Sequence, residues 1–443
     1  ASGGFYHMAL EREAAPALRA LGEDIGQHLG LAGGFSFTDW GQAIEALLNL
    51  GNDQPKLVVI DEFPYLVNNV PELPSLIQRC FGPRSPARAR SRTRLILCGS
   101  AISIMGKLLA GSAPLRGRAS LDLIVHPFDF RQSADFWGLH KQPETAFLVH
   151  AILGGTPAYR DLLRGGLPSS SADFDDWVTK SILDPASPLF REGRYLLAEE
   201  PGLTDRALYH SILSAIVSGF TRPGQIAATL NRPQASLAHS LNVLEDIQLV
   251  RRSEDAIRQK RPTYQIAEPI IRFYFAVMRS HLTRLELGRG RQIWRTEARA
   301  PFSSQVLGPH FEELARLWVA AFASPKTVGG VVGEVGSTVL QAPASRTNWE
   351  IDVVALSVRG EEGRNSRRKI LALGEAKWRK EPMKENQLER LLEVRQRLQQ
   401  QGDIDSSTAR IILFSSSGFT SGLLKRASDE VVLVDLQRLY FGD

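Results

Sequence analysis

Two carboxylates follow directly on an apolar run near the N-terminus. The run Leu57-Val58-Val59-Ile60 is typical of a strand buried on both faces of a parallel sheet, and it ends on Asp61 and Glu62. Such sheets bind ligands at the carboxyl ends of their strands. We expect Asp61 to hold Mg²⁺, often through water, and Glu62 to polarise a water that attacks a phosphate. The alternative is an acidic pair that only ends a buried strand in solvent.

A second run of this kind ends on a small polar residue. Its sequence is Leu95-Ile96-Leu97-Cys98-Gly99-Ser100, and Ser100 suits a sensor that hydrogen-bonds the γ-phosphate or the attacking water. The loop Gly-x-x-x-x-Gly-Lys-Ser/Thr, which would cradle the phosphates, does not occur in the sequence. The Gly-Lys pair at 106–107 has the wrong neighbours for it.

A third group of chemically active residues lies in the last quarter of the chain. Asp352 follows Glu350-Ile351, and Glu375 and Lys377 belong to Gly374-Glu375-Ala376-Lys377-Trp378. The period of two in a strand puts Glu375 and Lys377 on one face and Ala376 on the other. If the two strands pair, Asp352 and Glu375 can share a divalent cation through oxygen ligands, and Lys377 can orient or deprotonate a water. Glu334 and Glu350 are alternative ligands.

Bulk composition limits the class of protein that these residues serve. A chain of 443 residues fits two to four domains, and 43% apolar with 23% charged residues is typical of a globular protein. There is no apolar run of membrane-spanning length and no signal-peptide pattern at residues 1–7, so no membrane partner is expected. Two cysteines indicate a reducing cytoplasm. Arginines crowd 84–94, 251–261 and 284–299, where they either bind phosphates or lie in solvated loops.

The periodicity places these groups on an ordered series of elements. Strands are predicted at Phe5–Leu10, Lys56–Asp61, Arg94–Gly99 and Leu121–Val125, and a helix at Ala14–Leu29. Alternating strands and helices favour an α/β sheet for this first segment.

The middle of the chain has a different pattern. Helices are expected at Leu208–Val217, from Thr221 as the N-cap to Leu230, and at Gln234–Asp246, followed by strands at Val250–Ser253 and Pro262–Ile266. This is the order of a winged helix. Beyond it come a helix (His310–Phe322), strands at Val331–Leu340, Glu350–Leu356 and Lys369–Lys377, a helix (Lys384–Gln400) and a strand (Arg410–Phe414).

The first segment resembles the prokaryotic "archaeal-type" P-loop ATPases of the AAA/STAND group. The similar residues are Asp-Glu-Phe-Pro-Tyr-Leu at 61–66, Cys-Gly-Ser-Ala at 98–101, Pro-Leu-Arg-Gly-Arg at 114–118 and Gly-Gly-Thr-Pro-Ala-Tyr at 154–159. The resemblance implies ATP and Mg²⁺ as cofactors, Arg118 as a phosphate-sensing arginine, and Gly155 and Pro157 near the adenine. The alternative for Arg118 is a solvated loop. The family's P-loop strand is internal, so we expect it upstream of Ala1, because its loss would leave backbone groups unpaired.

The last segment resembles the PD-(D/E)XK, or restriction-endonuclease-like, superfamily. The order of the helix, three strands with Asp352 and Glu-x-Lys, helix and strand carries this resemblance, together with Leu-Phe-Ser-Ser-Ser-Gly-Phe at 413–419. It implies metal ligands at Glu312, Asp352 and Glu375, and catalytic roles for Asp352, Glu375 and Lys377. A nuclease fold that has lost its activity and serves recognition is the alternative.

The sequence thus predicts an α/β protein built from several domains. Residues 1–165 form a P-loop NTPase (AAA/STAND) sheet lacking its P-loop segment, 166–283 the lid and winged helix, 284–300 a basic linker, and 301–443 a restriction-endonuclease-like α/β domain. The expected function is an ATPase that controls a Mg²⁺-dependent nuclease acting on DNA, in defence or DNA processing, with nucleotide-dependent oligomerisation. The alternatives are a nucleotide-switched DNA-binding or regulatory protein with an inactive nuclease fold, and a STAND scaffold for oligomerisation.

For the winged helix, the sequence leaves two interpretations open. In the first, Gln234, Ser236 and His239 lie near a major groove, and Arg251, Arg252, Lys260 and Arg261 contact phosphates. In the second, the module is a nucleotide-dependent lever that does not touch DNA, which agrees with the lack of Arg and Lys in the third helix.

Overall fold

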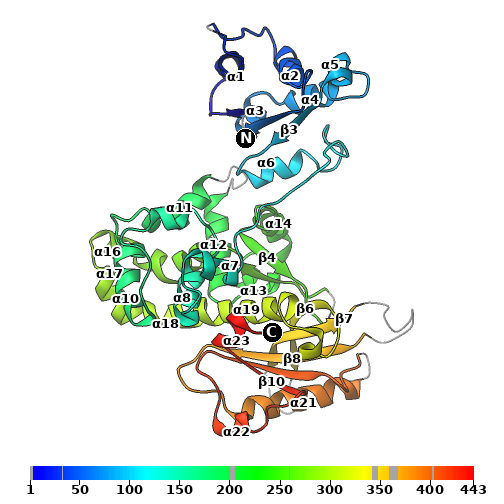
Figure 1. The fold of residues 1–443 in the computed structure, drawn as a ribbon. Coiled ribbons are helices and arrows are strands. Elements are labelled where there is room, and N and C mark those ends of the chain that lie inside the picture. The colour runs from blue at the N-terminus through cyan, green and yellow to red at the C-terminus, as the bar shows by residue number, and fades with distance from the viewer. Residues whose placement is uncertain are drawn as a thin grey trace. The chain divides into compact units, whose positions relative to one another are not determined.

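The computed structural model describes residues 3–31, 33–199, 205–258, 260–341, 348–358, 368–401 and 404–443. The chain forms two compact units, one with the residues up to Val125 and one with the residues from His126 onward. Figure 1 shows the ribbon of both, and each is described by itself below.

The first unit contains a small parallel sheet. Its strands are β1 (Phe5–Met8), β2 (Lys56–Asp61) and β3 (Thr93–Leu97), in the order β1-β2-β3. Its helices are α1 (Ala14–His28), α2 (Trp40–Asn49), α3 (Phe63–Asn69), α4 (Leu73–Cys80), α5 (Pro86–Arg90) and α6 (Ile102–Lys107). The parallel sheet and its mixed α/β surroundings confirm the predicted class, and the three strands lie within two residues of their predicted ends.

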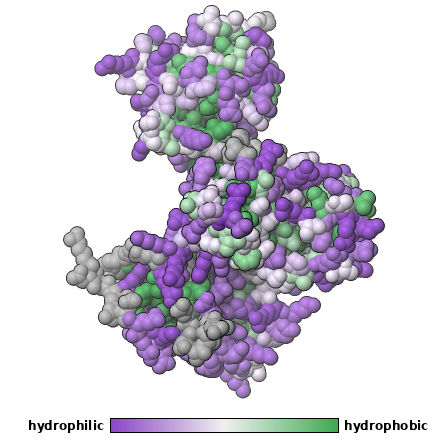
Figure 2. Space-filling view, turned by 180° about the vertical axis from the view of Figure 1, so that it is seen from behind, coloured by the Kyte–Doolittle hydropathy of each residue, from purple (hydrophilic) through white to green (hydrophobic). Residues whose placement is uncertain are grey.

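The two faces of this sheet differ in burial. Phe5, Val58 and Ile60 pack into the core beneath α1 and α2, and α1 turns a helical stripe of apolar residues inward. The other face exposes apolar side chains, which are Tyr6, Met8, Leu57 and Ile96. Hydrophobic patches on the surface are visible in Figure 2.

The fourth strand predicted in this unit is wrong. Residues 121–125 form neither a strand nor a helix, and Leu121, Leu123 and Val125 are largely exposed. A strand needs a hydrogen-bonded neighbour, and no strand among the described residues pairs with this segment. Its apolar sequence therefore lacks the partner that would make it a strand.

The second unit begins with a helical body. Its elements are α7 (Phe130–Phe136), α8 (Pro143–Leu153), α9 (Tyr159–Leu162), η1 (Ser171–Asp173), α10 (Phe174–Trp177), η2 (Val178–Ile182), α11 (Leu189–Glu199), α15 (Pro269–Phe273), η4 (Tyr274–Met278), η5 (Arg279–His281), α16 (Leu282–Glu286), α17 (Gly290–Ile293), η6 (Trp294–Ala298), α18 (Arg299–Pro301) and η7 (Phe302–Leu307). Residues 126–165, assigned by sequence to the ATPase core, belong to this unit, because α7 and α8 pack into its core.

The basic linker predicted at 284–300 is also wrong. This stretch is helical, and Leu285, Ile293 and Trp294 are buried in the same core. Its arginines face outward, where Arg284 pairs with Glu297 and Arg299 with Asp175. The polar composition that indicated a linker is thus the outer surface of a packed helical segment.

Three helices and a ribbon follow one another as predicted for the middle of the chain. They are α12 (Arg206–Val217), α13 (Pro223–Thr229), the turn η3 (Gln234–Leu237) with α14 (Ala238–Asp246), and the antiparallel strands β4 (Val250–Ser253) and β5 (Thr263–Ile266). The N-cap of α13 is Arg222 rather than the predicted Thr221. The element order is that of a winged helix, and the assignment to that class stays a prediction.

A five-stranded mixed sheet ends the chain. Its order is β10-β9-β8-β7-β6, with β6 (Val332–Gln341), β7 (Asn348–Ser357), β8 (Ile370–Lys377), β9 (Arg410–Ser415) and β10 (Val431–Asp435). The strands β8, β9 and β10 run parallel, and β6 and β7 run antiparallel to their neighbours. The accompanying helices are α19 (Gly308–Ala321), α20 (Pro325–Val328), α21 (Glu385–Gln401), α22 (Ser421–Leu424) and α23 (Leu436–Phe441).

Helices cover both faces of this sheet. Residues of α19 share one core with Val353, Ala376 and Phe414, and residues of α21 share the other with Val354 and Leu413. The alternation expected in a strand is therefore present, and it assigns Ala376 to the α19 face. Within the described part of the chain, no helix combines the length and apolar character needed to cross a membrane.

Candidate functional site

The first candidate site lies where β2 ends. Asp61 is the last residue of β2, and its carboxylate accepts hydrogen bonds from three donors on neighbouring segments. Tyr6 Oη donates to Oδ2 at 2.7 Å, and Cys98 Sγ and the Glu62 backbone N–H donate to Oδ1 at 3.2 and 2.9 Å. The hydrogen bonds from Tyr6 and Cys98 lower the pKa of Asp61, so it stays ionised. Burial and the contact with Asp61 raise the pKa of Cys98 to about 11, which keeps this thiol a donor.

Glu62 and Ser100 meet beside Asp61. Glu62 adopts a left-handed backbone conformation (φ 49°, ψ 39°) between β2 and α3. Such a conformation costs about 1–3 kcal/mol for a residue with a side chain and clusters at functional sites. The bend directs the carboxylate toward Ser100, whose hydroxyl lies 3.2 Å from Oε2. The structure therefore brings together three of the predicted residues, Asp61, Glu62 and Ser100.

Of the other residues predicted for nucleotide binding, one lies in the same unit and two belong to the other unit. Arg118 lies in the loop after α6, where its Nε donates to the Pro114 carbonyl at 3.2 Å. Gly155 and Pro157 belong to the second unit. Gly155 has a structural role there, because a Cβ atom would come within 1.9 Å of the Phe128 carbonyl oxygen, while Pro157 is exposed.

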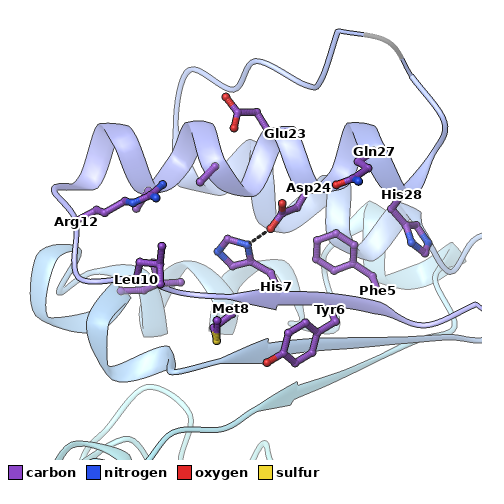
Figure 3. Close-up of a pocket in the computed structure, with 13 residues that line it drawn as sticks. Phe5, Tyr6, His7, Met8, Leu10, Arg12, Glu23, Asp24, Gln27 and His28 are labelled. Atoms are coloured by element: carbon purple, nitrogen blue, oxygen red, sulfur yellow. Dashed lines mark hydrogen bonds and ion pairs between the residues drawn. The ribbon is translucent and has the colours of Figure 1, made fainter.

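A groove of about 620 Å³ runs along β1 and α1 in the first unit. Figure 3 shows its lining, in which buried His7 points toward α1 and pairs with Asp24 at 2.6 Å, whereas Tyr6 points to the other side of the strand. The groove does not include Asp61 or Glu62. The His7–Asp24 pair therefore ties the edge strand to α1 and is separate from the carboxylates at the end of β2.

The second candidate site is built on β7 and β8. A β-bulge places two residues of β7, Asp352 and Val353, opposite the single Ser337 of β6. Bulges re-aim side chains and recur beside active sites. The Asp352 carboxylate turns toward β8, where its Oδ2 accepts from the Ala376 backbone N–H at 2.9 Å and lies 3.4 Å from Lys377 Nζ.

Glu375 is held between two cations of the chain. Lys377 Nζ lies 2.5 Å from its Oε1, and the Arg390 guanidinium from α21 pairs with its Oε2. Burial and then the charge of Asp352 raise the pKa of Glu375. Burial opposes the charge on Lys377, but the carboxylates of Asp352 and Glu375 outweigh it and raise its pKa. Lys377 is therefore an ammonium group that donates, rather than a base.

Glu312 lies on α19 near the same cluster. Burial raises its pKa to about 8, with Asp352 as the next cause, and Arg316 and Lys377 act in the opposite direction. Arg316 also fixes the β7 backbone, since its Nη1 donates to the Asp352 carbonyl at 2.9 Å. The structure thus gathers the four residues predicted for this site, Glu312, Asp352, Glu375 and Lys377.

The carboxylates have the donor chemistry that Mg²⁺ prefers, but the chain's own cations occupy them. Oxygen ligands from Glu312, Asp352 and Glu375 would suit a hard divalent cation. Among the described residues, however, no three His, Cys, Asp or Glu side chains form a ligand set around one point. Both oxygens of Glu375 are taken by Lys377 and Arg390. The residues fit a metal site only if at least one of these cations moves.

Sequence reasoning missed several residues that shape the two sites. Tyr6, Cys98, Arg316 and Arg390 all contact a predicted carboxylate or its backbone. A signal existed for Cys98, because the parallel register of β2 and β3 pairs Ile60 with Leu97 and so puts Cys98 next to Asp61. The approach of Arg390 depends on how α21 packs, which local sequence does not encode.

Comparisons with known proteins add little to this geometry. No model of a known protein family matches the chain. MJECL04, an uncharacterized protein of Methanocaldococcus jannaschii, is 29% identical over 282 residues, which are 63% of this chain and 59% of the relative. The chain therefore spans less than two thirds of the length of this relative. A crystal structure of Cdc6p from Pyrobaculum aerophilum matches at 15% identity over 67% of this chain and 81% of that chain, with a TM-score of 0.28.

Proposed function

We propose that the second unit carries a metal-dependent nuclease site that acts on DNA. The observation that supports this most is the convergence of Glu312, Asp352, Glu375 and Lys377 around a β-bulge. Clustering buried carboxylates is unfavourable without a compensating cation, which is why the pKa values of Glu312 and Glu375 are raised. Proteins retain such arrangements at functional sites more often than elsewhere.

In this proposal each residue has a distinct task. A bound divalent cation would neutralise charge on the phosphate that is attacked. Asp352 and Glu375 are its ligands, and the Ala376 N–H holds the Asp352 carboxylate in place. Lys377, as an ammonium group, orients the attacking water and does not deprotonate it. Glu312 has a pKa of about 8, so it can exchange a proton near neutral pH.

We further propose that the first unit hydrolyses ATP with Mg²⁺. The support is the contact between Glu62 and Ser100 beside an ionised Asp61 at the carboxyl end of a parallel sheet. The exposed apolar face with Tyr6, Leu57 and Ile96 favours the packing of a further element on this sheet, and the segment 121–125 has no strand partner among the described residues. A phosphate-binding loop on such an element would supply the backbone N–H groups that ATP needs.

The ribbon and its helices supply the surface on which DNA binding is proposed. Gln234, Ser236 and His239 are exposed at the start of the third helix, and Lys260 and Arg261 are exposed at the ribbon. Arg251 and Arg252 are less available, because they pair with Glu313 and Glu254. We expect phosphate contacts from Lys260 and Arg261 first.

A regulatory protein with an inactive nuclease fold is the second candidate function. It is favoured by the pairing of both Glu375 oxygens with Lys377 and Arg390, which leaves the carboxylate neutralised without a metal. The deciding experiment incubates the natural full-length protein with plasmid, single-stranded DNA and RNA, with Mg²⁺ and with or without ATP. Metal-dependent cleavage supports the nuclease, and its absence on all substrates in both nucleotide states supports the regulatory function.

A further inference from the structure

The guanidinium of Arg390 lies where a cation bound to Glu375 would lie. Arg390 extends from α21 and pairs with Oε2 of Glu375, a carboxylate that is only 1% exposed. Lys377 holds the other oxygen at 2.5 Å. A buried carboxylate is strongly destabilising unless it has a counter-charge, and a guanidinium cannot lose its proton in a protein. Arg390 therefore carries its positive charge at every relevant pH and neutralises Glu375 as long as the two are paired.

Arg390 is nevertheless placed so that it can leave. Its side chain is 28% exposed, against 2% for that of Glu375, so the guanidinium has a route to solvent that the carboxylate lacks. Within the described residues, the Nε atom of Arg390 has no hydrogen-bond partner that would help to hold the guanidinium in place. The helix itself is anchored independently, because Leu388, Leu391, Val394 and Leu398 bury its apolar face.

We propose that Arg390 is the resident cation of this site and that a divalent ion binds Glu375 only by displacing it. This inference rests on the proposed nuclease function, which requires Glu375 as a metal ligand. It explains why Glu312 and Glu375 both lie close enough to Asp352 for burial and then its charge to raise their pKa values, yet the three carboxylates do not form a ligand set in the described structure. Metal affinity is then set by competition with Arg390 as well as by the carboxylates.

The test is a Mn²⁺ titration of the full chain by isothermal titration calorimetry. Arg390→Gln removes the charge while keeping a long, helix-compatible side chain. The matched control is Arg426→Gln, which removes the same charge from an exposed pair with Glu389 of α21. Loss of the guanidinium removes the charge that competes for the carboxylate, so we expect Arg390→Gln to bind Mn²⁺ at least about tenfold more tightly than the wild type. Arg426→Gln should match the wild type.

The outcomes separate this inference from the proposed function. Mn²⁺ binding by the wild type that is unchanged or weakened in Arg390→Gln would overturn the competition and leave the nuclease proposal standing. No binding by either protein, with no cleavage, would end both. The increase in Mn²⁺ affinity must also disappear when Arg390→Gln is combined with Glu375→Gln. If it persists, the added Mn²⁺ binding does not occur at Glu375.

A second variant covers a failure of Arg390→Gln to fold. Arg390→Lys keeps the charge on a shorter side chain that cannot form the planar fork, so its Mn²⁺ affinity should lie between those of the wild type and the neutral variant. An affinity equal to that of the wild type would overturn the proposal. Thermal melts with and without Mn²⁺ provide an independent readout, in which the stabilisation by metal should be larger in both Arg390 variants than in the wild type.

Discussion

The two carboxylate groups of this protein differ in what compensates their charge. At the end of β2, Asp61 accepts hydrogen bonds from neutral donors, the Tyr6 hydroxyl and the Cys98 thiol, and Glu62 lies beside the hydroxyl of Ser100. No ion pair of Asp61 or Glu62 occurs among the described residues. At β7 and β8, by contrast, Asp352 and Glu375 are buried and paired with Lys377, and Arg390 adds a second cation at Glu375.

This difference has a physical cause. A partly exposed carboxylate keeps its hydration and needs only orientation, which neutral hydrogen bonds provide. A buried carboxylate loses its hydration, and the chain must supply opposite charge or raise the pKa of the acid. The first group is thus open to an added cation, whereas the second must exchange an internal cation for it.

The largest expected effect is on cleavage by the second unit. Asp352→Ala should abolish Mg²⁺-dependent cutting, and Lys377→Ala should slow it by about 10²–10⁴-fold, because Lys377 holds both carboxylates and orients the water. Glu389→Gln, an exposed change on α21, is the control. Cutting and ATP turnover should be measured side by side, and ATP turnover should survive all three changes. Full cleavage by Asp352→Ala would exclude this site.

ATP hydrolysis at the end of β2 should be sensitive to the loss of a single carboxylate. Glu62→Gln in the natural full-length protein should leave ATP binding intact and slow hydrolysis by about 10²-fold or more, since Glu62 lies beside Ser100 at the end of the sheet. Glu72→Gln, an exposed residue at the start of α4, serves as the control. Turnover unchanged in Glu62→Gln would remove this residue from the mechanism.

The two carboxylate groups also show which features of the fold the sequence could predict. Apolar runs that end on acidic or small polar residues predicted β2, β3 and β8, and the strand period placed Glu375 and Lys377 correctly relative to Ala376. The spacing could not predict the bulge at Asp352, because a bulge depends on the register with β6.

The errors have the same origin in tertiary contacts. Residues 121–125 have a strand-like sequence without a neighbouring strand among the described residues, and Trp294 lies in a stretch whose polar composition indicated a linker. Local pattern gives the type of element, but burial and pairing are decided by segments distant in sequence.

DNA binding should depend more on exposed basic residues than on arginines that already form ion pairs. The double change Lys260→Glu with Arg261→Glu should weaken binding by about tenfold or more and reduce the slope of log K against log salt by about two, because both residues are exposed. Arg251→Gln should change DNA affinity less, since Arg251 already pairs with the half-buried Glu313. Fluorescence anisotropy at several salt concentrations measures both. Equal effects of the two changes would show that ion pairing does not withhold Arg251 from DNA.

A smaller effect is expected on the pH dependence of stability. The pKa of Glu312 is raised from 4.5 to about 8, so its contribution to stability is fully present below pH 4.5 and is lost as the pH rises to about 8. Glu312→Gln should therefore flatten the decline of the unfolding free energy over this range, by up to about 1.4 kcal/mol per pH unit. Denaturant titrations at several pH values, with exposed Glu393→Gln on α21 as the control, measure it. If the unfolding free energies of Glu312→Gln and the wild type declined in parallel with pH, the pKa of Glu312 would not be raised.

The smallest effect should come from Tyr6→Phe, which removes one neutral donor from Asp61. The hydrogen bond from Tyr6 is the main cause of the lowered pKa of Asp61, so the pKa should rise toward its ordinary value. Stability should change little, because Tyr6 is exposed and Asp61 is partly exposed, and surface substitutions usually stay within about 0.5 kcal/mol. The carboxyl pKa can be followed by NMR, with Tyr65→Phe, a change to another exposed tyrosine, as the control. Tyr6→Phe could instead destabilise the first unit as strongly as a substitution of a buried residue. Asp61 would then depend on partners within the chain as Glu375 does, and the two carboxylate groups would not differ in this respect.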